Sequence, residues 1–314
     1  MGPVLAVAAS LLLSADTLCV TSQDLRVPTP EGHVLAAILE MPRSARRAVP
    51  AVLLISGAGE WDIGYTFGDF RGKYPFYRLL SEQLVRAGFA VVRYHKRGLG
   101  ASTGNYRETA TTARLADDAR AIIGAMRKTH VIDGRRISVL GHSEGGSIAG
   151  LLGASDHELA GVILMAAPAW DGARIMVHQH RHMLAQPHDL SVDRRISFLL
   201  REDAERYENE GWYRYFLTYD PLPSYARIRS PVLIVHGADD WKVTVGQADE
   251  IASAIRRGGS KARVDVHKLE GVDHVFGSPG ATGGEAAFNQ RTRSILVEWL
   301  RSVTPTSVAA GCAR

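Results

Sequence analysis

Serine chemistry is indicated by the run Gly-His-Ser-Glu-Gly-Gly at residues 141–146. The apolar stretch 136–140 precedes this run and the small residues 147–152 follow it, which predicts a strand, a sharp turn and a helix. Glycines on both sides of Ser143 let the backbone turn sharply, so that the hydroxyl stands clear of the sheet edge. A serine hydroxyl is a poor nucleophile until a neighbouring base takes its proton, so the motif needs partners.

Two later loops contain the partners that such a serine requires. Residues 236–243 hold two adjacent aspartates, and residues 271–276 hold His274. Each loop follows a predicted buried strand, and in a parallel sheet such loops emerge together at the carboxyl edge, where ligands bind. Ser143, an acid near residue 240 and His274 can therefore meet. In that arrangement the histidine moves the proton and the carboxylate fixes its tautomer and stabilises its charge.

Alternating strands and helices organise the chain around these loops. A hairpin is predicted from residues 23–29 and 34–41, followed by buried strands at 51–55, 89–94, 136–140, 161–168, 231–235 and 262–269, with helices at 74–87, 112–129, 244–257 and 291–303. This order predicts an α/β fold with a mostly parallel, doubly wound sheet flanked by helices. Residues 170–228 are charged, aromatic and His-rich with no central strand, which predicts a helical lid inserted after the sixth strand.

These patterns divide the chain into five segments. We expect a leader or signal-like segment at 1–22, the first part of an α/β core at 23–169, the lid at 170–228, the second part of the core at 229–303 and a disordered tail at 304–314.

The beginning of the chain contains the apolar run 4–13, which has about the length of a signal-peptide core and is too short to span a bilayer as a helix. No Lys or Arg precedes the run and no good cleavage site follows it. Export is slightly favoured over a cytoplasmic location, and a disordered leader or a misplaced start codon is the alternative.

Composition excludes several classes of protein. The 314 residues are 46% hydrophobic, enough for a sizeable core, and the net charge of +4 comes from scattered Lys and Arg, which does not suggest nucleic-acid binding. Only two cysteines occur, Cys19 and Cys312, with no CxxC pair, and a disulfide between them has no support. No cofactor is indicated, and neither the oligomeric state nor the identity of a substrate can be predicted.

Other histidines and the tryptophans have competing interpretations. His178 and His182 are spaced by one helical turn, with His180 between them, but no acidic or cysteine residue sits at ligand spacing, so a solvated helix face is favoured over a metal site. His95 and His142 are expected to be hydrogen-bonded structural residues. Four tryptophans could line an acyl pocket or serve ordinary packing: Trp61, Trp170, Trp212 and Trp241.

Taken together, the motifs resemble the α/β-hydrolase superfamily, nearest to the bacterial esterases and the aminopeptidase-like and monoglyceride-lipase-like serine hydrolases. The resemblance covers residues 23–303 and is carried by the runs at 57–59, 93–102, 141–146, 237–240 and 271–274. It implies the α/β-hydrolase fold and the chain order nucleophile, acid, histidine.

Carried onto this sequence, the resemblance implies a catalytic triad. Ser143 would be the nucleophile and His274 the general base and then acid. The family pattern Gly-x-x-Asp-x-x-Val fits Asp240 together with Gly237 and Val243, so Asp240 is favoured over Asp239 as the acid.

The resemblance also implies an oxyanion hole made of two backbone N–H groups, those of Ala58 and Glu144. The Glu144 side chain is expected to point away from the substrate. Where the family usually has His-Gly, this chain has Ser56-Gly57, which leaves the local hydrogen bonding of that loop open.

The predicted function is hydrolysis of a small-molecule carboxylic ester, or a related acyl bond, through an acyl-enzyme on Ser143. An aminopeptidase-like amidase, a thioesterase and an acyltransferase on the same triad are alternatives. A non-catalytic hydrolase-like binding protein is the alternative from another class. Epoxide hydrolases and dehalogenases on this fold need a carboxylate at the elbow, which Ser143 excludes.

Overall fold

An eight-stranded sheet forms the centre of the protein, seen in a computed structural model that describes residues 20–69, 72–183, 202, 211–277 and 288–306. The strand order is β1-β2-β6-β3-β7-β8-β9-β10. The strands are β1 (Val20–Pro28), β2 (Val34–Pro42), β3 (Val49–Ile55), β6 (Ala90–Tyr94), β7 (Ile132–His142), β8 (Gly161–Met165), β9 (Val232–Gly237) and β10 (Val264–Leu269). All neighbouring pairs from β6 to β10 are parallel, and β2 runs antiparallel to both of its neighbours.

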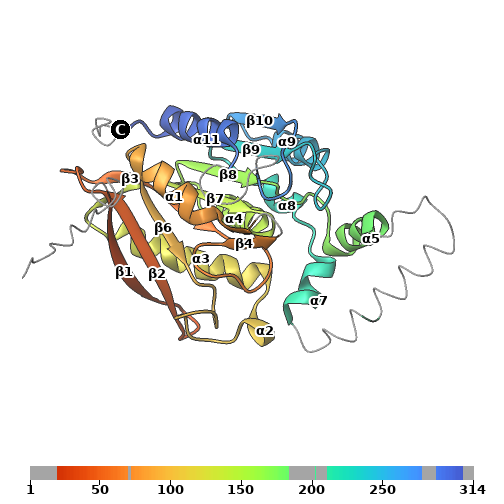
Figure 1. The fold of residues 1–314 in the computed structure, drawn as a ribbon, viewed down its shortest axis with the longest axis horizontal. Helices are drawn as coiled ribbons and strands as arrows, with labels where there is room; N and C mark the ends of the chain where they lie inside the picture. Colours follow the sequence, from red (N-terminus) through yellow and green to blue (C-terminus); the bar gives the residue numbers. More distant parts are fainter. Residues whose placement is uncertain (1–19, 70–71, 184–201, 203–210, 278–287, 307–314) are drawn as a thin grey trace, which may run out of the picture.

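Helices cover both faces of this sheet (Figure 1). They are α1 (Phe76–Arg86), α2 (Tyr106–Thr109), α3 (Thr112–Arg127), α4 (Glu144–Ser155), α5 (Gly172–Met183), α7 (Gly211–Thr218), α8 (Leu222–Tyr225), α9 (Gln247–Arg257) and α11 (Gln290–Val303). Buried side chains of α3, α4, α8 and α9 form one apolar cluster, and those of α1 and α11 form another. The sheet therefore separates two cores.

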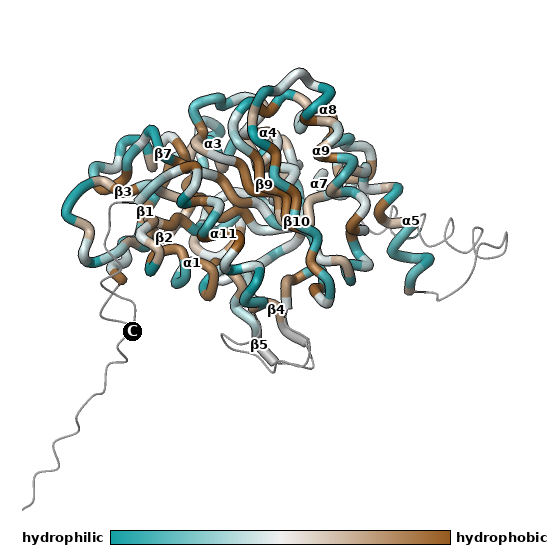
Figure 2. Tube along the Cα trace, turned by 90° about the horizontal axis from the view of Figure 1, so that it is seen from above, coloured by the Kyte–Doolittle hydropathy of each residue, from teal (hydrophilic) through white to brown (hydrophobic). Residues whose placement is uncertain are grey.

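The central strands form because their residues are apolar on both faces. In β3 every residue is buried, with Leu53 and Ile55 in the α3–α4 cluster and Val52 and Leu54 in the α1–α11 cluster. This alternation with a period of two is what a strand covered on both faces requires. Figure 2 shows the hydrophobic strands gathered at the centre of the molecule.

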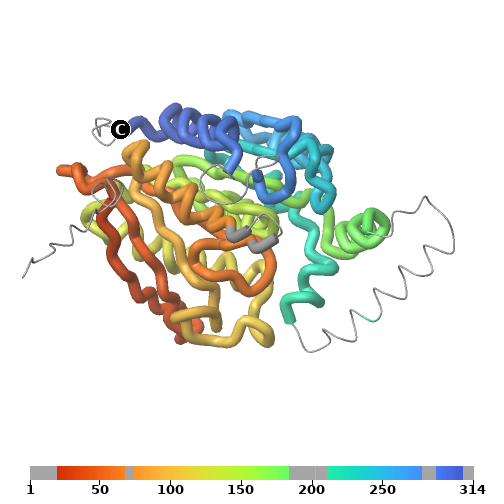
Figure 3. The backbone as a smooth tube through the Cα atoms, viewed as in Figure 1, coloured from red at the N-terminus to blue at the C-terminus, as the bar shows by residue number. Residues whose placement is uncertain are grey.

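The predicted fold class is confirmed: the sheet is mostly parallel, flanked by helices, and its strands and main helices lie where the sequence predicts them. The first and last strands, β1 and β10, form its two edges (Figure 3). Two expectations concerning the ends of the chain lie wholly or partly outside the described residues, namely the leader and the tail beyond residue 306; Cys19 and Cys312 also lie outside them. Strand β1 begins at Val20, ahead of the boundary expected after residue 22.

A second, two-stranded sheet was not predicted. It consists of β4 (Thr66–Asp69) and β5 (Gly72–Pro75), paired antiparallel. Tyr74 and Pro75, expected to begin a helix, end β5 instead, and the helix begins at Phe76. Strands of four residues are too short to show a reliable period, which explains the error.

The described part of 170–228 is helical. Helices α5 and α7 contact one another at one end of the molecule (Figure 1), whereas α8 packs on α4 and α9 of the core. The segments 184–201 and 203–210, which belong to the predicted lid, lie outside the described residues.

A substitution in the central sheet tests this packing. Ile163 of β8 is fully buried in the α1–α11 cluster, and we expect Ile163→Ala to lower the free energy of unfolding by about 2–5 kcal/mol, because a cavity remains where the side chain was. Val131 is 36% exposed, and Val131→Ala is the control, expected to change stability far less. Urea denaturation measures both, and equal losses would contradict the assignment of the core.

Candidate active site

Ser143 occupies a sharp turn between the last residue of β7 and the first residue of α4. Its φ of 56° and ψ of −124° place it in a backbone region that L-residues rarely adopt. The turn is held by hydrogen bonds from the Ser143 N–H to the Met165 carbonyl (2.9 Å) and from the Gly146 N–H to the Ser143 carbonyl (2.8 Å). The predicted strand–turn–helix is therefore present, with the serine at its apex.

The glycines of the motif are required by close backbone contacts. A Cβ at Gly141 would lie 1.8 Å from the Gly145 carbonyl oxygen, and a Cβ at Gly145 would lie 2.1 Å from the Ile55 carbonyl oxygen. No side chain fits at either position, because backbone atoms occupy the space. The turn is thus wedged between its own strand and β3.

Asp240 is the acid that meets His274. Its Oδ2 accepts a hydrogen bond from His274 Nδ1 at 2.7 Å, and its Oδ1 accepts the backbone N–H groups of Lys242 and Val243, both at 2.9 Å. Asp239 is exposed, and its backbone N–H donates to the Val272 carbonyl. Of the two aspartates, Asp240 is therefore the one that contacts His274.

The surroundings of Asp240 favour its charged form. Burial by itself would raise the pKa of the Asp240 carboxyl, but His274 and His236 outweigh burial and bring the pKa well below its ordinary value. His236 Nε2 lies 3.4 Å from Oδ2 and donates to the Val243 carbonyl at 2.7 Å. The carboxylate can therefore hold the Nδ1–H tautomer of His274, leaving Nε2 to exchange a proton.

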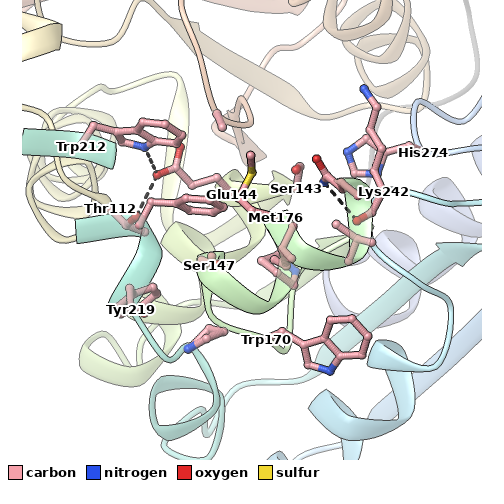
Figure 4. A pocket seen from close by; sticks show the side chains of 18 of the residues that line it. Thr112, Ser143, Glu144, Ser147, Trp170, Met176, Trp212, Tyr219, Lys242 and His274 are labelled. Atoms are coloured by element: carbon pink, nitrogen blue, oxygen red, sulfur yellow. Dashed lines mark hydrogen bonds between the residues drawn. The ribbon is translucent and has the colours of Figure 1, made fainter. Parts of the chain in front are cut away.

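One cavity brings the predicted site residues together. It has a volume of about 450 Å³, and Ser143, His274, Ala58 and Glu144 all line it. Asp240 contacts His274 and is not part of the lining. Figure 4 shows Ser143 and His274 toward one side of this cavity and Glu144 with Trp212 toward the other.

The loop 57–59 lies against the serine. A Cβ at Gly57 would lie 3.1 Å from Ser143 Cβ. Three side chains hold the loop: Lys96 Nζ donates to the Gly57 carbonyl, Trp61 Nε1 donates to the Ala58 carbonyl (2.5 Å), and the Gly59 N–H donates to the Tyr106 hydroxyl (3.1 Å).

These contacts show how the loop is hydrogen-bonded in this chain, which has Ser56-Gly57 where the family usually has His-Gly. Within the described part of the chain, the Ala58 N–H has no hydrogen-bond acceptor. It is therefore available to a ligand in the cavity.

His142 is a structural residue, as expected. Its Nε2 lies 2.7 Å from the His274 carbonyl oxygen and its Nδ1 lies 2.9 Å from the Tyr65 hydroxyl. Because a carbonyl can only accept, Nε2 carries the proton and Nδ1 accepts from Tyr65. Burial, together with the adjacent His274, lowers the pKa of His142 to about 3, so the ring stays neutral and supports the loop that carries His274.

The rings of three further histidines, His178, His180 and His182, contact other protein groups. His178 Nε2 bonds the Trp241 carbonyl, His180 Nδ1 bonds the Met176 carbonyl, and His182 stacks on Trp241 with ring centroids 4.6 Å apart. Among the described residues no cluster of ligands could hold a metal ion. For His95, the expectation of a hydrogen-bonded ring was wrong at Nδ1, which is buried and has no partner among the described residues.

The expectation about the Glu144 side chain needs correction. The Glu144 side chain does not point away from the cavity: it lines it, is 4% exposed, and its Oε1 accepts from Thr112 Oγ1 (2.8 Å) and Trp212 Nε1 (2.6 Å). Trp61, Trp170 and Trp212 line the cavity, but Trp241 does not. Further aromatic residues of the lining come from residues 65–67 and from the segment 213–219, and the sequence does not reveal them because no period distinguishes a pocket wall from packing: Tyr65, Phe67, Tyr213, Phe216 and Tyr219.

Comparisons with known proteins agree with this fold. Residues 70–210 match the family model described as serine aminopeptidase, S33. No curated protein sequence matches the chain. The Pyrococcus furiosus esterase Pf2001 is similar in structure, with a TM-score of 0.65 at 16% identity over 90% of this chain and 91% of that chain.

Two further solved structures are similar over most of their length. The α/β hydrolase GrgF from Penicillium sp. sh18 has a TM-score of 0.61 at 16% identity, over 90% of this chain and 99% of that chain. Est1E from Butyrivibrio proteoclasticus, solved with ferulic acid bound, has a TM-score of 0.57 at 18% identity, over 88% and 96%. These comparisons show that the chain has the α/β-hydrolase fold. Its described helices include none that is both long enough and apolar enough to cross a membrane.

The buried His142 predicts a specific dependence of stability on pH. Its pKa is about 3 in the folded protein and its ordinary value is 6.5, so the unfolded chain takes up the proton first as the pH falls. The stabilising contribution is complete above about pH 6.5 and declines between there and pH 3, by at most about 1.4 kcal/mol per pH unit.

Urea denaturation between pH 7 and pH 4.5 measures this slope. His142→Gln, which keeps an amide donor and acceptor without a titrating group, is expected to show a slope smaller by about one proton. Equal slopes for the two proteins would contradict the assignment of a neutral His142.

Proposed function

We propose that this α/β hydrolase cleaves carboxylic esters, or related acyl bonds, through an acyl-enzyme on Ser143. The observation that carries the proposal is the hydrogen bond from His274 Nδ1 to Asp240, with His274 and Ser143 lining the same cavity. A base oriented by a buried carboxylate beside a serine on a strained turn is the arrangement that activates a hydroxyl.

In the proposed reaction, Ser143 Oγ attacks the acyl carbon and its proton passes to His274 Nε2. The Asp240 carboxylate stabilises the imidazolium, while the N–H groups of Ala58 and Glu144 bind the oxyanion. The C–O bond to the leaving group breaks, and the alcohol departs with the proton from His274. A water molecule, deprotonated by His274, then attacks the acyl-enzyme, and the acid leaves as Ser143 recovers its proton.

The cavity supports an apolar acyl or alcohol group. Its walls are mainly aromatic and aliphatic: Trp61, Tyr65, Phe67, Pro168, Trp170, Ile175, Met176, Trp212, Tyr213, Phe216, Tyr219, Pro221 and Val243. A cavity of about 450 Å³ is of the size that holds a small molecule. Because α5 and α7 supply several of these walls, we assign them the role of a lid that selects the substrate.

An aminopeptidase-like amidase is the second candidate, and the match of residues 70–210 to the S33 family favours it. Such an enzyme needs an acidic group to hold a free amine. Among the described residues that line the cavity, Glu144 is the carboxylate, and its Oε1 already accepts two hydrogen bonds. The ester reaction therefore remains the better-supported proposal.

A turnover panel tests the function directly. We expect the parent protein to hydrolyse p-nitrophenyl esters with an optimum at one chain length set by the cavity, and Ser143→Ala to lose this activity. Aminoacyl anilides belong to the same panel, and turnover of the anilides alone would favour the amidase. A fluorophosphonate probe should label the parent and not the variant; absence of both labelling and turnover would favour a non-catalytic binding protein.

Substitutions of the neighbouring Asp239 and Asp240 test which of the two is the acid of the proposed triad. Asp240→Asn should lower kcat by about 10⁴-fold, since an amide cannot hold His274 in the required tautomer and stabilise its charge. Asp239→Asn changes an exposed side chain and should leave kcat within about twofold of the parent. Steady-state kinetics on the best ester compares them, and similar losses in both variants would overturn the assignment of Asp240.

A further inference from the structure

Lys96 is a buried cation beside the proposed oxyanion hole. It lies in the loop that follows β6, and its side chain is only 2% exposed. Its ammonium donates a hydrogen bond to the Gly57 carbonyl and lies 3.9 Å from Glu144 Oε2. A lysine is almost never this deeply buried unless it is paired, so these contacts explain its position.

The Gly57 carbonyl belongs to the same peptide group as the Ala58 N–H. This peptide is trans, so its C=O and N–H point in opposite directions. With Lys96 on the carbonyl side, the N–H points away from the lysine. A cation on the oxygen also draws electron density from the peptide nitrogen, which makes the Ala58 N–H a stronger donor.

Glu144 provides the other N–H of the proposed oxyanion hole. Its side-chain carboxylate is a second reason why a cation is needed at Lys96. Its Oε1 is held by Thr112 and Trp212 (Figure 4), while its buried Oε2 has no hydrogen-bond partner among the described residues. The carboxylate belongs to the residue next to Ser143, so its charge would oppose the negative charge that develops on the substrate oxygen. Lys96 lies where it can neutralise that charge.

We propose that Lys96 and Glu144 form a buried ion pair that orients and polarises the Gly57–Ala58 peptide for oxyanion binding. Lys96 is then a positioning residue: it touches no substrate and acts through the Ala58 N–H. This inference rests on the proposed serine hydrolase function. It explains how an acidic residue can follow the nucleophile, since Lys96 offsets the negative charge of Glu144.

The ion pair of Lys96 and Glu144 predicts how kcat depends on pH. Burial lowers the pKa of the Lys96 ammonium, and Glu144 partly opposes that shift. The other titratable groups near it are Tyr106, whose ring centre is 5.6 Å from Nζ, and Tyr65, whose hydroxyl adjoins Gly57 and whose pKa is raised far above its ordinary value by burial. We therefore expect kcat to fall on the alkaline side as Lys96 loses its proton.

Kinetics of three variants test the inference with the p-nitrophenyl ester that the parent hydrolyses best. Lys96→Met should lower kcat by about 10- to 100-fold with KM within about threefold, because the interaction serves the transition state. Lys96→Met should also lower, by a similar factor, the affinity for a trifluoromethyl ketone inhibitor, because the hemiketal that this inhibitor forms on Ser143 carries an oxyanion. Lys261→Met, at an exposed lysine, is the control and should match the parent.

Glu144→Gln gives a readout that a merely structural role would not move. The variant retains an oxygen for Thr112 and Trp212 but removes the charge, so the alkaline limb of the kcat profile should shift to lower pH. In Lys96→Met that limb should be absent. If Lys96→Met does not fold, the position of the limb in Glu144→Gln decides the question.

Parent-like kcat and inhibitor affinity in Lys96→Met would overturn the inference, as would an unmoved alkaline limb in Glu144→Gln. These results leave the proposed function standing, because the parent would still lose its activity with Ser143→Ala. Failure of the proposed function is recognised separately, by a parent that neither turns over esters nor reacts with the fluorophosphonate.

Discussion

The close approach of three backbone segments at the serine turn is the constraint on which the site depends. The strand before Ser143, the helix after it and the end of β3 are so close that a methyl group at Gly141 or Gly145 would overlap a carbonyl oxygen. Dispersion and backbone hydrogen bonds from the surrounding sheet hold this crossing and balance the strained φ of Ser143. The serine and the loop 57–59 are adjacent because β3 and β7 are neighbours in the sheet.

The charges and proton positions at the site are set by burial and by contacts between pairs of titratable side chains. Asp240 is kept ionised by the histidines against it, and His142 is kept neutral by burial and bonded on both nitrogens. Lys96 and Glu144 are buried near one another below the loop that lines the cavity. A buried charge without a partner would cost free energy, so each of these groups restricts where its neighbour can lie.

Local sequence patterns mispredict this structure where tertiary contacts override them. The strands β4 and β5 are too short for their period to be recognised, and Pro75 looked like a helix start although it ends a strand. The Glu144 side chain was expected to avoid the cavity because such a residue contributes its backbone N–H. Its partners Thr112 and Trp212 come from 32 and 68 residues away along the chain, and no local pattern could reveal them.

The sequence alone determined the order along the chain of the main-sheet strands and of the helices that flank them, the burial of the central strands on both faces and the residues of the serine turn. These features depend on the period of apolar residues and on glycine, which are local properties of the chain. Only the tertiary structure decided that Thr112 and Trp212 bond the Glu144 carboxylate, which aromatic side chains enclose the cavity, and that Lys96 bonds the Gly57 carbonyl. These are contacts between residues distant in the chain, and they depend on distances of a few ångströms that are set only when the sheet and its helices pack together.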